Sequence, residues 1–330
     1  MPEATIRDVA RRAQVSVATV SRALNGLENV SEITRTRVAD AVRELGYVPH
    51  AGARSLSLAR TNAIGVVLPD LHGEFFSEIV RGMDREAGRR GYLLLLSNLH
   101  GSGAQASLAL RAMRGRVDGL IVMAPHLGEE ELAAAVPAGL PSVLINTRAV
   151  GAAHASIHLD NAAGARAVVD HLASIGRKKL VHIAGPEQNI DAQERAAAFD
   201  SAAAERGLET VTVHGNFEES SGVTAVKALL DAGHRFDAIF AGNDNMAIGA
   251  IVALRSAGID VPGQIAVAGF DDIPLAHHLG LTTVRVRIAD LGERALVRLI
   301  DGLEQGDLGG DERHAPELIV RATTDAGAAC

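Results

Sequence analysis

The spacing of apolar residues divides the chain into two regions of different period. Between Ile6 and Leu45, apolar residues recur at the spacing of helices that bury one face. From Asn62 onward, short uninterrupted runs of Val, Ile and Leu alternate with longer stretches of helical spacing. The pattern therefore predicts a small all-helical segment followed by a long α/β region.

The first region carries signals for three short helices. Thr5 and Asp8 form a capping-box pattern that begins the first helix, and Ser16 is the expected N-cap of the second. A third helix is expected from Ser31 to Leu45, and Gly46 is the residue that ends it. The turn between the first two helices is too short for a side-by-side hairpin, which indicates a helix-turn-helix.

The solvent face of the second helix suits a DNA major groove. Its small residues permit close approach, Arg22 can reach a guanine edge, and nearby hydroxyls can hold phosphates. A purely structural three-helix bundle would show similar apolar stripes, but the full pattern over residues 5–25 favours DNA binding. The expected DNA contacts in this region are Thr5, Ser16, Val17, Ala18, Thr19, Ser21, Arg22, Asn25 and Ser31.

Residues 49–61 interrupt the helical pattern and leave two interpretations open. After Pro49 comes a stretch of small residues that contains one arginine and one protruding leucine. It is either a plain linker or a helix that orders only on DNA. In the second case Ala53 would enter the minor groove and Leu56 would wedge a base step.

The α/β region predicts parallel sheets covered by helices. Its strands are mostly continuous apolar runs, as expected of parallel strands that are buried on both faces. Strands are expected at residues 63–68, 92–97, 119–124, 142–146, 156–160, 180–185, 210–214, 238–241 and 265–270, and helices among others at 77–90, 162–175, 192–206 and 246–257. This number of strands is too large for one sheet. We therefore expect two lobes of doubly wound α/β structure, with ligands bound beyond the carboxyl ends of the strands.

Charge is distributed unevenly between the two regions. The whole chain has a net charge of −8, but residues 1–60 carry +3 and the remainder −11. A basic head on an acidic body directs only one end toward phosphates. Cys330 is the single cysteine, which excludes an intramolecular disulfide, and neither a signal peptide nor a membrane-spanning apolar run is recognisable. We therefore expect a cytoplasmic, nucleoid-associated protein.

Enzymatic chemistry finds no support in the sequence. His154 with His158, and His277 with His278, are the only close histidine pairs, and neither has further ligands at metal-binding spacing. Residues 101–103 lack the spacing of a nucleophile elbow, and no phosphate-binding loop follows a strand. We expect no catalytic residue, no metal and no cofactor.

Several motifs together resemble the lactose-repressor (LacI/GalR) family of transcription regulators, over essentially the whole chain. They lie at residues 5–10, 17–26, 30–31, 45–49 and 53–56 in the first region, and at 240–249, 267–272, 281–283 and 318–321 in the second. The resemblance implies an N-terminal all-α helix-turn-helix head and a two-lobed core of doubly wound parallel sheets like a type I periplasmic binding protein. It also implies a symmetric homodimer on a pseudo-palindromic operator, base reading by Val17, Ala18 and Arg22, and intercalation by Leu56.

The resemblance also assigns domain limits. Residues 1–48 would form the DNA-binding domain, 49–61 the hinge, and 62–330 the effector-binding and dimerisation core. Within the core, the first lobe would comprise about 62–161 and 292–322, and the second lobe about 162–291 and 323–330.

Strand ends in the core supply candidate groups for an effector pocket. Asp, Asn and Arg side chains can each form paired hydrogen bonds with adjacent hydroxyls, and an aromatic ring can stack on the apolar face of a sugar. The expected effector-binding residues are Asp70, His72, Glu74, Phe76, Asn146, Asp191, Arg195, Phe217, Asn243 and Asp271. Any one of them alone could instead be a helix cap or turn residue. The resemblance aligns Asn146, Arg195, Asn243 and Asp271 with the family's effector contacts.

One departure from the family pattern bears on the effector. Gly73 and Glu74 replace the usual Asn-Pro before two phenylalanines, which puts an extra carboxylate at the mouth of the pocket and disfavours an anionic effector. The sequence therefore predicts a repressor of a carbohydrate-utilisation operon that a mono- or disaccharide inducer releases from its operator. The alternatives are a regulator that uses its effector as a co-repressor, and a sugar-binding receptor of a transport system.

Overall fold

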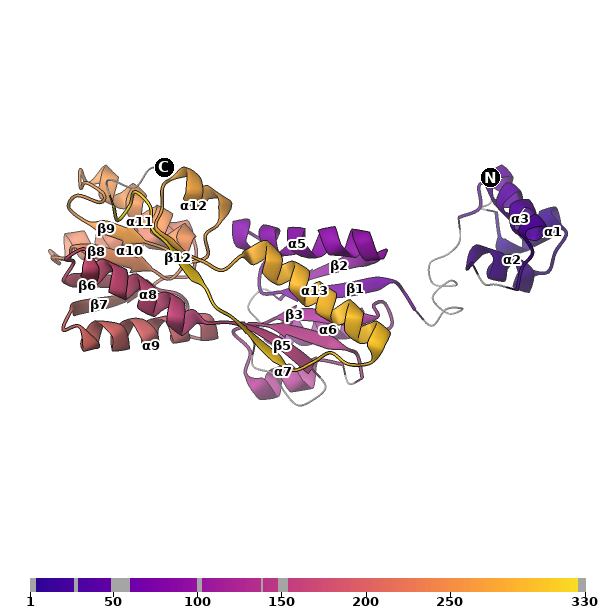
Figure 1. Ribbon diagram of the computed structural model, residues 1–330, viewed down its shortest axis with the longest axis horizontal. Helices are drawn as coiled ribbons and strands as arrows, with labels where there is room; N and C mark the ends of the chain where they lie inside the picture. The colour runs from indigo at the N-terminus through magenta and orange to yellow at the C-terminus, as the bar shows by residue number, and fades with distance from the viewer. Residues whose placement is uncertain are drawn as a thin grey trace. The chain divides into compact units, whose positions relative to one another are not determined.

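The computed structural model describes residues 4–26, 29–48, 60–99, 103–137, 139–147 and 154–325. The chain forms two compact units, Met1–Ala63 with Gly115–Asp118, and Ile64–Arg114 with Gly119–Cys330 (Figure 1). Ala53 and Leu56, which were expected to act in a hinge, and Cys330 lie outside the described residues. Among the described helices, none is both long and apolar enough to span a membrane.

The first unit contains the three expected helices. They are α1 (Ile6–Ala13), α2 (Val17–Leu24) and α3 (Glu32–Leu45). Thr5 and Asp8 form the reciprocal capping box, while the Ser16 and Ser31 hydroxyls accept hydrogen bonds from Thr19 N at 3.1 Å and Thr34 N at 3.4 Å. The expected starts of all three helices are confirmed. Their apolar stripes meet in a small core centred on Val9, Ala10, Ala13, Val20, Val38 and Ala41.

The side chain of Asp118 holds the residues that precede the first strand of the core. Both carboxylate oxygens of Asp118 take part, accepting hydrogen bonds from Thr61 N at 2.6 Å, Thr61 Oγ1 at 2.8 Å and Asn62 N at 2.8 Å. Asn62 has a left-handed backbone with φ of 50°. The end of the expected hinge segment is therefore fixed by a side chain from elsewhere in the sequence.

The first lobe of the core is built on a six-stranded sheet. Its strands follow the order β11-β5-β4-β3-β1-β2 and comprise β1 (Ala63–Leu68), β2 (Leu93–Asn98), β3 (Gly119–Met123), β4 (Ser142–Ile145), β5 (His154–Leu159) and β11 (Asp311–His314). The registered pairs β1–β3, β3–β4, β4–β5 and β5–β11 are all parallel. Its helices are α5 (Glu74–Arg90), α6 (Gly103–Met113), α7 (Glu129–Ala135) and α13 (Ile288–Gln305).

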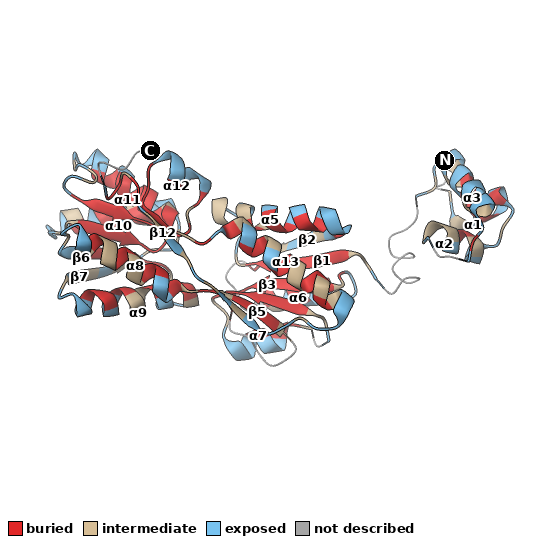
Figure 2. Ribbon diagram, viewed as in Figure 1, coloured by how far each residue is buried: buried red, intermediate tan, exposed pale blue. Residues whose placement is uncertain are grey.

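The second lobe is built on a four-stranded parallel sheet of order β7-β6-β8-β9. The strands are β6 (Lys179–Ala184), β7 (Glu209–His214), β8 (Ala238–Ala241) and β9 (Ala266–Ala268). The helices are α8 (Asn161–Ser174), α9 (Ile190–Glu205), α10 (Glu219–Asp231), α11 (Asp244–Ser256) and α12 (Pro274–His278). Buried residues fill the central strands β1, β3, β4 and β8, which confirms the interpretation of their apolar runs. Figure 2 shows β1 and β3 as buried.

Three short strands were not expected from the sequence. β10 (Thr283–Arg285) and β12 (Glu317–Ile319) form an antiparallel pair, and β11 lies at the edge of the first sheet. None of the three contains a long apolar run. β11 consists entirely of Asp, Glu, Arg and His, so hydropathy carries no signal for it.

The chain crosses between the lobes three times: at Asp160 after β5, at residues 286–287 between β10 and α13, and at residues 315–316 between β11 and β12. The sequence placed these crossovers near residues 161, 291 and 322, and its domain limits stay a prediction. β12 pairs with β10, which groups residues 317–319 with the second lobe. We propose lobe limits of 62–160 with 288–314 for the first lobe, and 161–285 with 317–325 for the second.

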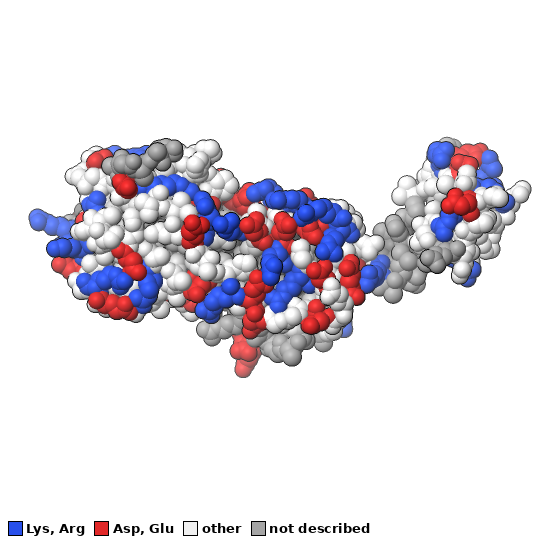
Figure 3. All heavy atoms as spheres, in the orientation of Figure 1, with Lys and Arg blue, Asp and Glu red and all other residues white. Residues whose placement is uncertain are grey.

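Helices α5 and α13 pack with their backbones in direct contact. A Cβ atom on Gly82 would lie 1.9 Å from the carbonyl oxygen of Ala289, and one on Gly292 would lie 2.1 Å from that of Ile79. Only glycine permits this approach. Arginines and acids interleave over the exposed side of the two helices (Figure 3), with Arg89 bonded to Glu293 at 2.8 Å and Arg90 to Asp301 at 3.0 Å.

Helices α10 and α11 in the second lobe pack in the same way, which gives a testable prediction. A Cβ atom on Gly249 would lie 2.0 Å from the carbonyl oxygen of Glu219. We expect Gly249→Ala to lower the free energy of unfolding by about 1–3 kcal/mol, because the helices must separate. Gly88→Ala, in a helix position with no atom within 4 Å of the new methyl, should raise it by about 0.5–1 kcal/mol. Urea unfolding would measure both, and equal effects would contradict the packing explanation.

Candidate functional site

The outer face of α2 is open to a partner. Val17 is 41% exposed, and Ala18 and Arg22 are also exposed. Within the described part of the chain, no hydrogen bond or ion pair engages the Arg22 guanidinium. Its five N–H donors are therefore available to a ligand such as a base edge or a phosphate.

Three of the hydroxyls expected to contact DNA, those of Thr5, Ser16 and Ser31, also cap helices. Ser16 Oγ and Thr19 Oγ1 are 2.8 Å apart, and Ser31 Oγ and Thr34 Oγ1 are 2.9 Å apart. In each pair one hydroxyl donates to the other, which leaves one O–H for an outside acceptor. Thr5 Oγ1 donates to Asp8 at 2.6 Å, so its proton is already committed. The DNA-contacting role of these residues stays a prediction.

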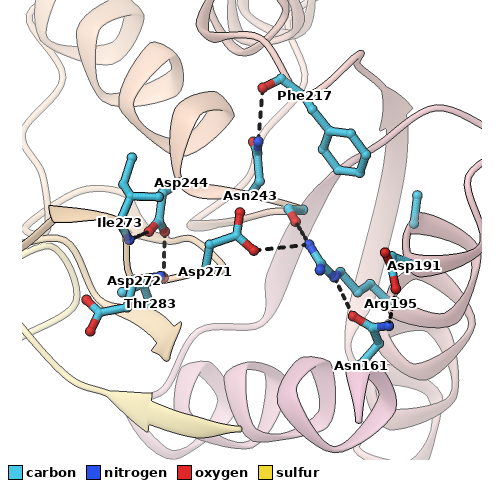
Figure 4. Close-up of polar contacts among 12 residues, drawn as sticks. Asn161, Asp191, Arg195, Phe217, Asn243, Asp244, Asp271, Asp272, Ile273 and Thr283 are labelled. Carbon is cyan, nitrogen blue, oxygen red and sulfur yellow. Dashed lines mark hydrogen bonds and ion pairs between the residues drawn. The ribbon is translucent and has the colours of Figure 1, made fainter. Parts of the chain in front are cut away.

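A cavity of about 830 Å³ lies beyond the carboxyl ends of strands from both lobes. All ten residues expected to bind an effector line it: Asp70, His72, Glu74, Phe76, Asn146, Asp191, Arg195, Phe217, Asn243 and Asp271. Figure 4 shows that several of them point toward one another from separate elements of the second lobe. The structure thus brings together residues up to two hundred positions apart in the sequence, while their contact with an effector stays a prediction.

Arg195 is the buried cation of this cavity, with 5% of its surface exposed. Its Nε donates to Asn161 Oδ1 at 2.8 Å (Figure 4), and Nη1 donates to the carbonyl oxygen of Gly242. The guanidinium lies 3.7 Å from the ring centre of Phe270. Asn161 in turn donates to Asp191 Oδ1 at 2.7 Å. Sequence reasoning did not single out Asn161 as a site residue, although it directly follows the first crossover.

Asp271 faces Arg195 without a direct hydrogen bond. Its Oδ1 lies 3.8 Å from Arg195 Nη1, and that oxygen has no hydrogen-bond partner among the described residues. Burial raises the pKa of Asp271 to about 7, against the lowering effect of Arg195 and with a further rise from Asp191. The backbone of Asp271 is left-handed with φ of 113°, a conformation that non-glycine residues rarely adopt. A buried acceptor without a donor suits a ligand hydroxyl.

Asp244 holds the loop that carries Asp271. Its Oδ1 accepts from Thr283 Oγ1 at 2.5 Å and its Oδ2 accepts from Ile273 N at 2.9 Å (Figure 4). Burial, followed by the charge of Asp271, raises the pKa of Asp244 well above its usual value. Asp244 belongs to a motif that the sequence identified, but its structural role was missed because its partners are distant in the chain.

Phe217 forms an aromatic wall of the cavity. Its ring lies so close to Gly185 that a Cβ atom there would be 2.3 Å from it. Asn243 Nδ2 donates to the carbonyl oxygen of Phe217 at 2.9 Å, which holds the left-handed backbone of that residue, with φ of 70°. The ring is therefore positioned by its surroundings before any ligand arrives.

Asp70 and Glu74 each use one carboxylate oxygen to accept hydrogen bonds from backbone N–H groups. Asp70 Oδ1 accepts from Leu71 N at 2.7 Å and from His72 N at 3.1 Å, which folds the loop after β1 upon itself. Glu74 Oε2 accepts from Leu275 N at 3.0 Å. Both carboxylates retain a second oxygen for other partners.

The cavity is acidic in balance. The acidic residues that line it are Asp70, Glu74, Asp191, Glu218, Glu219 and Asp271, against Arg195 and His72. Such a wall accepts hydrogen bonds from hydroxyl or amino groups and repels phosphate and carboxylate groups. In the described part of the chain, no group of His, Cys, Asp and Glu side chains is arranged to hold a metal ion.

Two known families match parts of the sequence. Residues 5–50 match the bacterial regulatory proteins of the lacI family, and residues 169–324 match a periplasmic binding protein-like domain. The ribose operon repressor of Halalkalibacterium halodurans is 34% identical over 327 residues, which cover 98% of each chain. The HTH-type transcriptional regulator GalR of Escherichia coli strain K12 is 35% identical over 298 residues, which cover 88% of this chain and 87% of GalR.

Solved structures share the whole architecture. The lac repressor dimer bound to operator and the anti-inducer ONPF has a TM-score of 0.88 and 28% identity, covering 97% of this chain and 99% of that one. The complex of the transcriptional regulator CelR with cellobiose has a TM-score of 0.72 and 29% identity over the same shares of the two chains. The helical head and two-lobed core therefore occur together in these proteins.

The high pKa of Asp271 gives a testable pH dependence. The unfolded carboxyl group loses its proton near pH 3.8 and the folded one near pH 7, so Asp271 contributes stability that is lost as the pH rises between these values. The free energy of unfolding of Asp271→Asn should therefore rise relative to that of wild type as the pH increases from 4 to 7. The rise is about 1.4 kcal/mol per pH unit, which amounts to a few kcal/mol in total. Urea unfolding at a series of pH values would measure this. Exposed Asp84→Asn is the control, and a pH-independent difference for Asp271→Asn would contradict the assignment.

Proposed function

Because the chain belongs to the lacI family of bacterial regulatory proteins, we propose that it represses a carbohydrate-utilisation operon and that a sugar inducer releases it from a pseudo-palindromic operator. The chain is a DNA-binding transcriptional regulator and not an enzyme. The relatives that it matches over most of its length are transcriptional regulators too. The observation that carries the proposal is the presence, in one chain, of an exposed helix-turn-helix face and a cavity lined by all ten expected effector residues.

Operator recognition is assigned to α2. Arg22 is exposed and unengaged within the described residues, which suits a bidentate contact with guanine. Val17 and Ala18 present methyl groups that can contact thymine, and the helix N-terminus can hold a phosphate. Ala53 and Leu56 complete the proposal as minor-groove contacts of the hinge, in a segment outside the described residues. Because operator DNA is the partner, we place the protein in the cytoplasm, associated with the nucleoid.

The effector is assigned to the class of neutral mono- or disaccharides. A volume of about 830 Å³ is within the range of small-molecule sites and leaves room for two sugar rings. The unpaired oxygen of Asp271 and the carboxylates around it accept hydrogen bonds from hydroxyls, and Phe217 can stack on a ring. The relatives include a ribose operon repressor, and CelR was solved with cellobiose. Release by an inducer is proposed over co-repression because the cavity favours a neutral ligand.

The protein is proposed to act as a homodimer. Leu93, Leu95 and Leu96 of the edge strand β2 are 71%, 37% and 44% exposed, and Leu108 of α6 is 63% exposed. An exposed apolar edge strand is a surface that proteins normally cover. The lac repressor structure, which is similar over the whole chain, is a dimer. A two-fold dimer would present two heads to a two-fold operator.

Two substitutions should separate the two activities. We expect Arg22→Ala to cost about 1–3 kcal/mol of discrimination between operator and nonspecific DNA while effector binding stays intact. Arg195→Ala should abolish the effector response while operator binding stays intact, since Arg195 lies in the other unit of the chain. Electrophoretic mobility shift with DNA from the gene's own promoter region, and calorimetry with neutral sugars and their phosphate esters, would measure the two activities.

Different experimental results would contradict different parts of the proposed function. Absence of binding to any DNA at low salt would overturn the regulator assignment, and binding of phosphate esters in preference to neutral sugars would overturn the effector class. Loss of operator binding in Arg195→Ala would indicate a structural rather than an effector-binding role for that residue.

The dimer surface can be tested by charge. We expect Leu96→Asp to produce monomers at micromolar concentration, because a carboxylate in an apolar interface has no partner. Analytical ultracentrifugation would measure the mass. Ile175→Asp changes a residue of similar exposure, 38%, at the end of α8 in the second lobe and should leave the dimer intact. A dimeric Leu96→Asp variant would place the interface elsewhere.

A further inference from the structure

Glu74 forms a hydrogen bond between the two lobes at the rim of the cavity. It is the first residue of α5 in the first lobe, and its Oε2 accepts from the backbone N–H of Leu275 at 3.0 Å. Leu275 belongs to α12 in the second lobe. Both residues line the cavity, so the bond lies where the lobes face each other.

The N-terminus of α12 lacks a cap from its own segment. Its N-cap residue, Ile273, has no side-chain oxygen, and Pro274 at the first helical position has no N–H. The N–H of Leu275 is therefore the first amide of the helix that needs an acceptor. A carboxylate suits this position because its hydrogen bond with an N–H is charge-assisted and therefore stronger than one to a neutral oxygen. Glu74 supplies from the opposite lobe what a capping Ser or Asp supplies locally elsewhere.

The capped helix adjoins the strained loop that carries Asp271. Asp271 and Asp272 have left-handed φ values of 113° and 56°, and the next residue, Ile273, is held by Asp244 at 2.9 Å. The segment is thus held within the second lobe by Asp244 and by β10, where Asp271 N donates to the carbonyl oxygen of Val284 at 2.8 Å. Glu74 adds a contact from the first lobe through α12. Strained backbone persists only where its surroundings hold it.

We propose that Glu74 is a positioning residue that caps α12 across the cleft, thereby holding the lobes together at the cavity rim and Asp271 in place for the effector. The part that concerns the effector rests on the proposed function, whereas the cap itself does not. Glu74 thereby acts through Leu275 and Asp271 and not chiefly by touching the ligand. Its substitution should alter α12 even when no sugar is present.

Three variants of the full-length protein test the cap by hydrogen–deuterium exchange. Glu74→Ala should raise the exchange rate of the Leu275 amide about tenfold, because a bond to a charged acceptor is lost at a partly exposed site. Glu74→Gln keeps an acceptor oxygen of the same reach and should restore most of the protection. Glu129→Ala is the matched control: Glu129 also begins a first-lobe helix after a glycine N-cap, but is exposed and makes no hydrogen bond to another described residue.

Calorimetry with D-ribose and cellobiose tests the consequence for binding. For whichever sugar the wild type binds, Glu74→Ala should weaken affinity about five- to tenfold, and Glu74→Gln by less than about threefold. Unchanged exchange at Leu275 in Glu74→Ala would overturn the cap, and faster exchange with unchanged affinity would overturn the positioning role. If neither sugar binds the wild type but exchange responds as expected, the cap stands and the assignment of these sugars fails.

Discussion

The buried guanidinium of Arg195 is the constraint on which the cavity depends. Removing such a charge from water costs several kcal/mol unless nearby groups compensate it. The compensating groups are Asn161 at the start of α8, the carbonyl oxygen of Gly242 after β8, and the ring of Phe270 after β9. These groups come from separate elements. The hydrogen bonds and the ring contact of Arg195 therefore form only where the strand ends of the second lobe lie close together.

The same cation leaves the cavity ready for a ligand. Asp271 faces this guanidinium from 3.8 Å, a distance too long for a hydrogen bond, and one of its buried oxygens has no donor among the described residues. A ligand hydroxyl placed there would complete the hydrogen bonding of both Arg195 and Asp271. The acidic residues that line the cavity, among them Asp191 and Glu74, favour ligands that donate hydrogen bonds over anionic ones, in agreement with the proposed effector class.

The core separates rigid lobes from the segments that join them. Glycines such as Gly82 and Gly249 let paired helices touch along their backbones, which leaves little freedom inside either lobe. The lobe motion that the proposed function requires would fall at the three crossovers and at contacts across the cleft, such as that of Glu74 with Leu275. An effector that binds groups of both lobes shifts the balance between their arrangements, which is how the proposed inducer would act on the DNA-binding head.

The sequence by itself determined the features that rest on local signals. Ser16 and Ser31 mark helix starts because a side-chain oxygen next to an apolar stripe satisfies the first free amides, and runs of Val, Ile and Leu mark strands buried on both faces. The positions of polar and aromatic residues at strand ends indicated the ten residues that line the cavity, and the family motifs aligned four of them. Tertiary structure alone decided the charged edge strand β11, the support that Asp244 gives to the loop of Asp271, and the bond of Glu74 to the opposite lobe. Each of these depends on a partner far away in the chain, and a local pattern of residues carries no information about which distant atoms will satisfy a buried or exposed polar group.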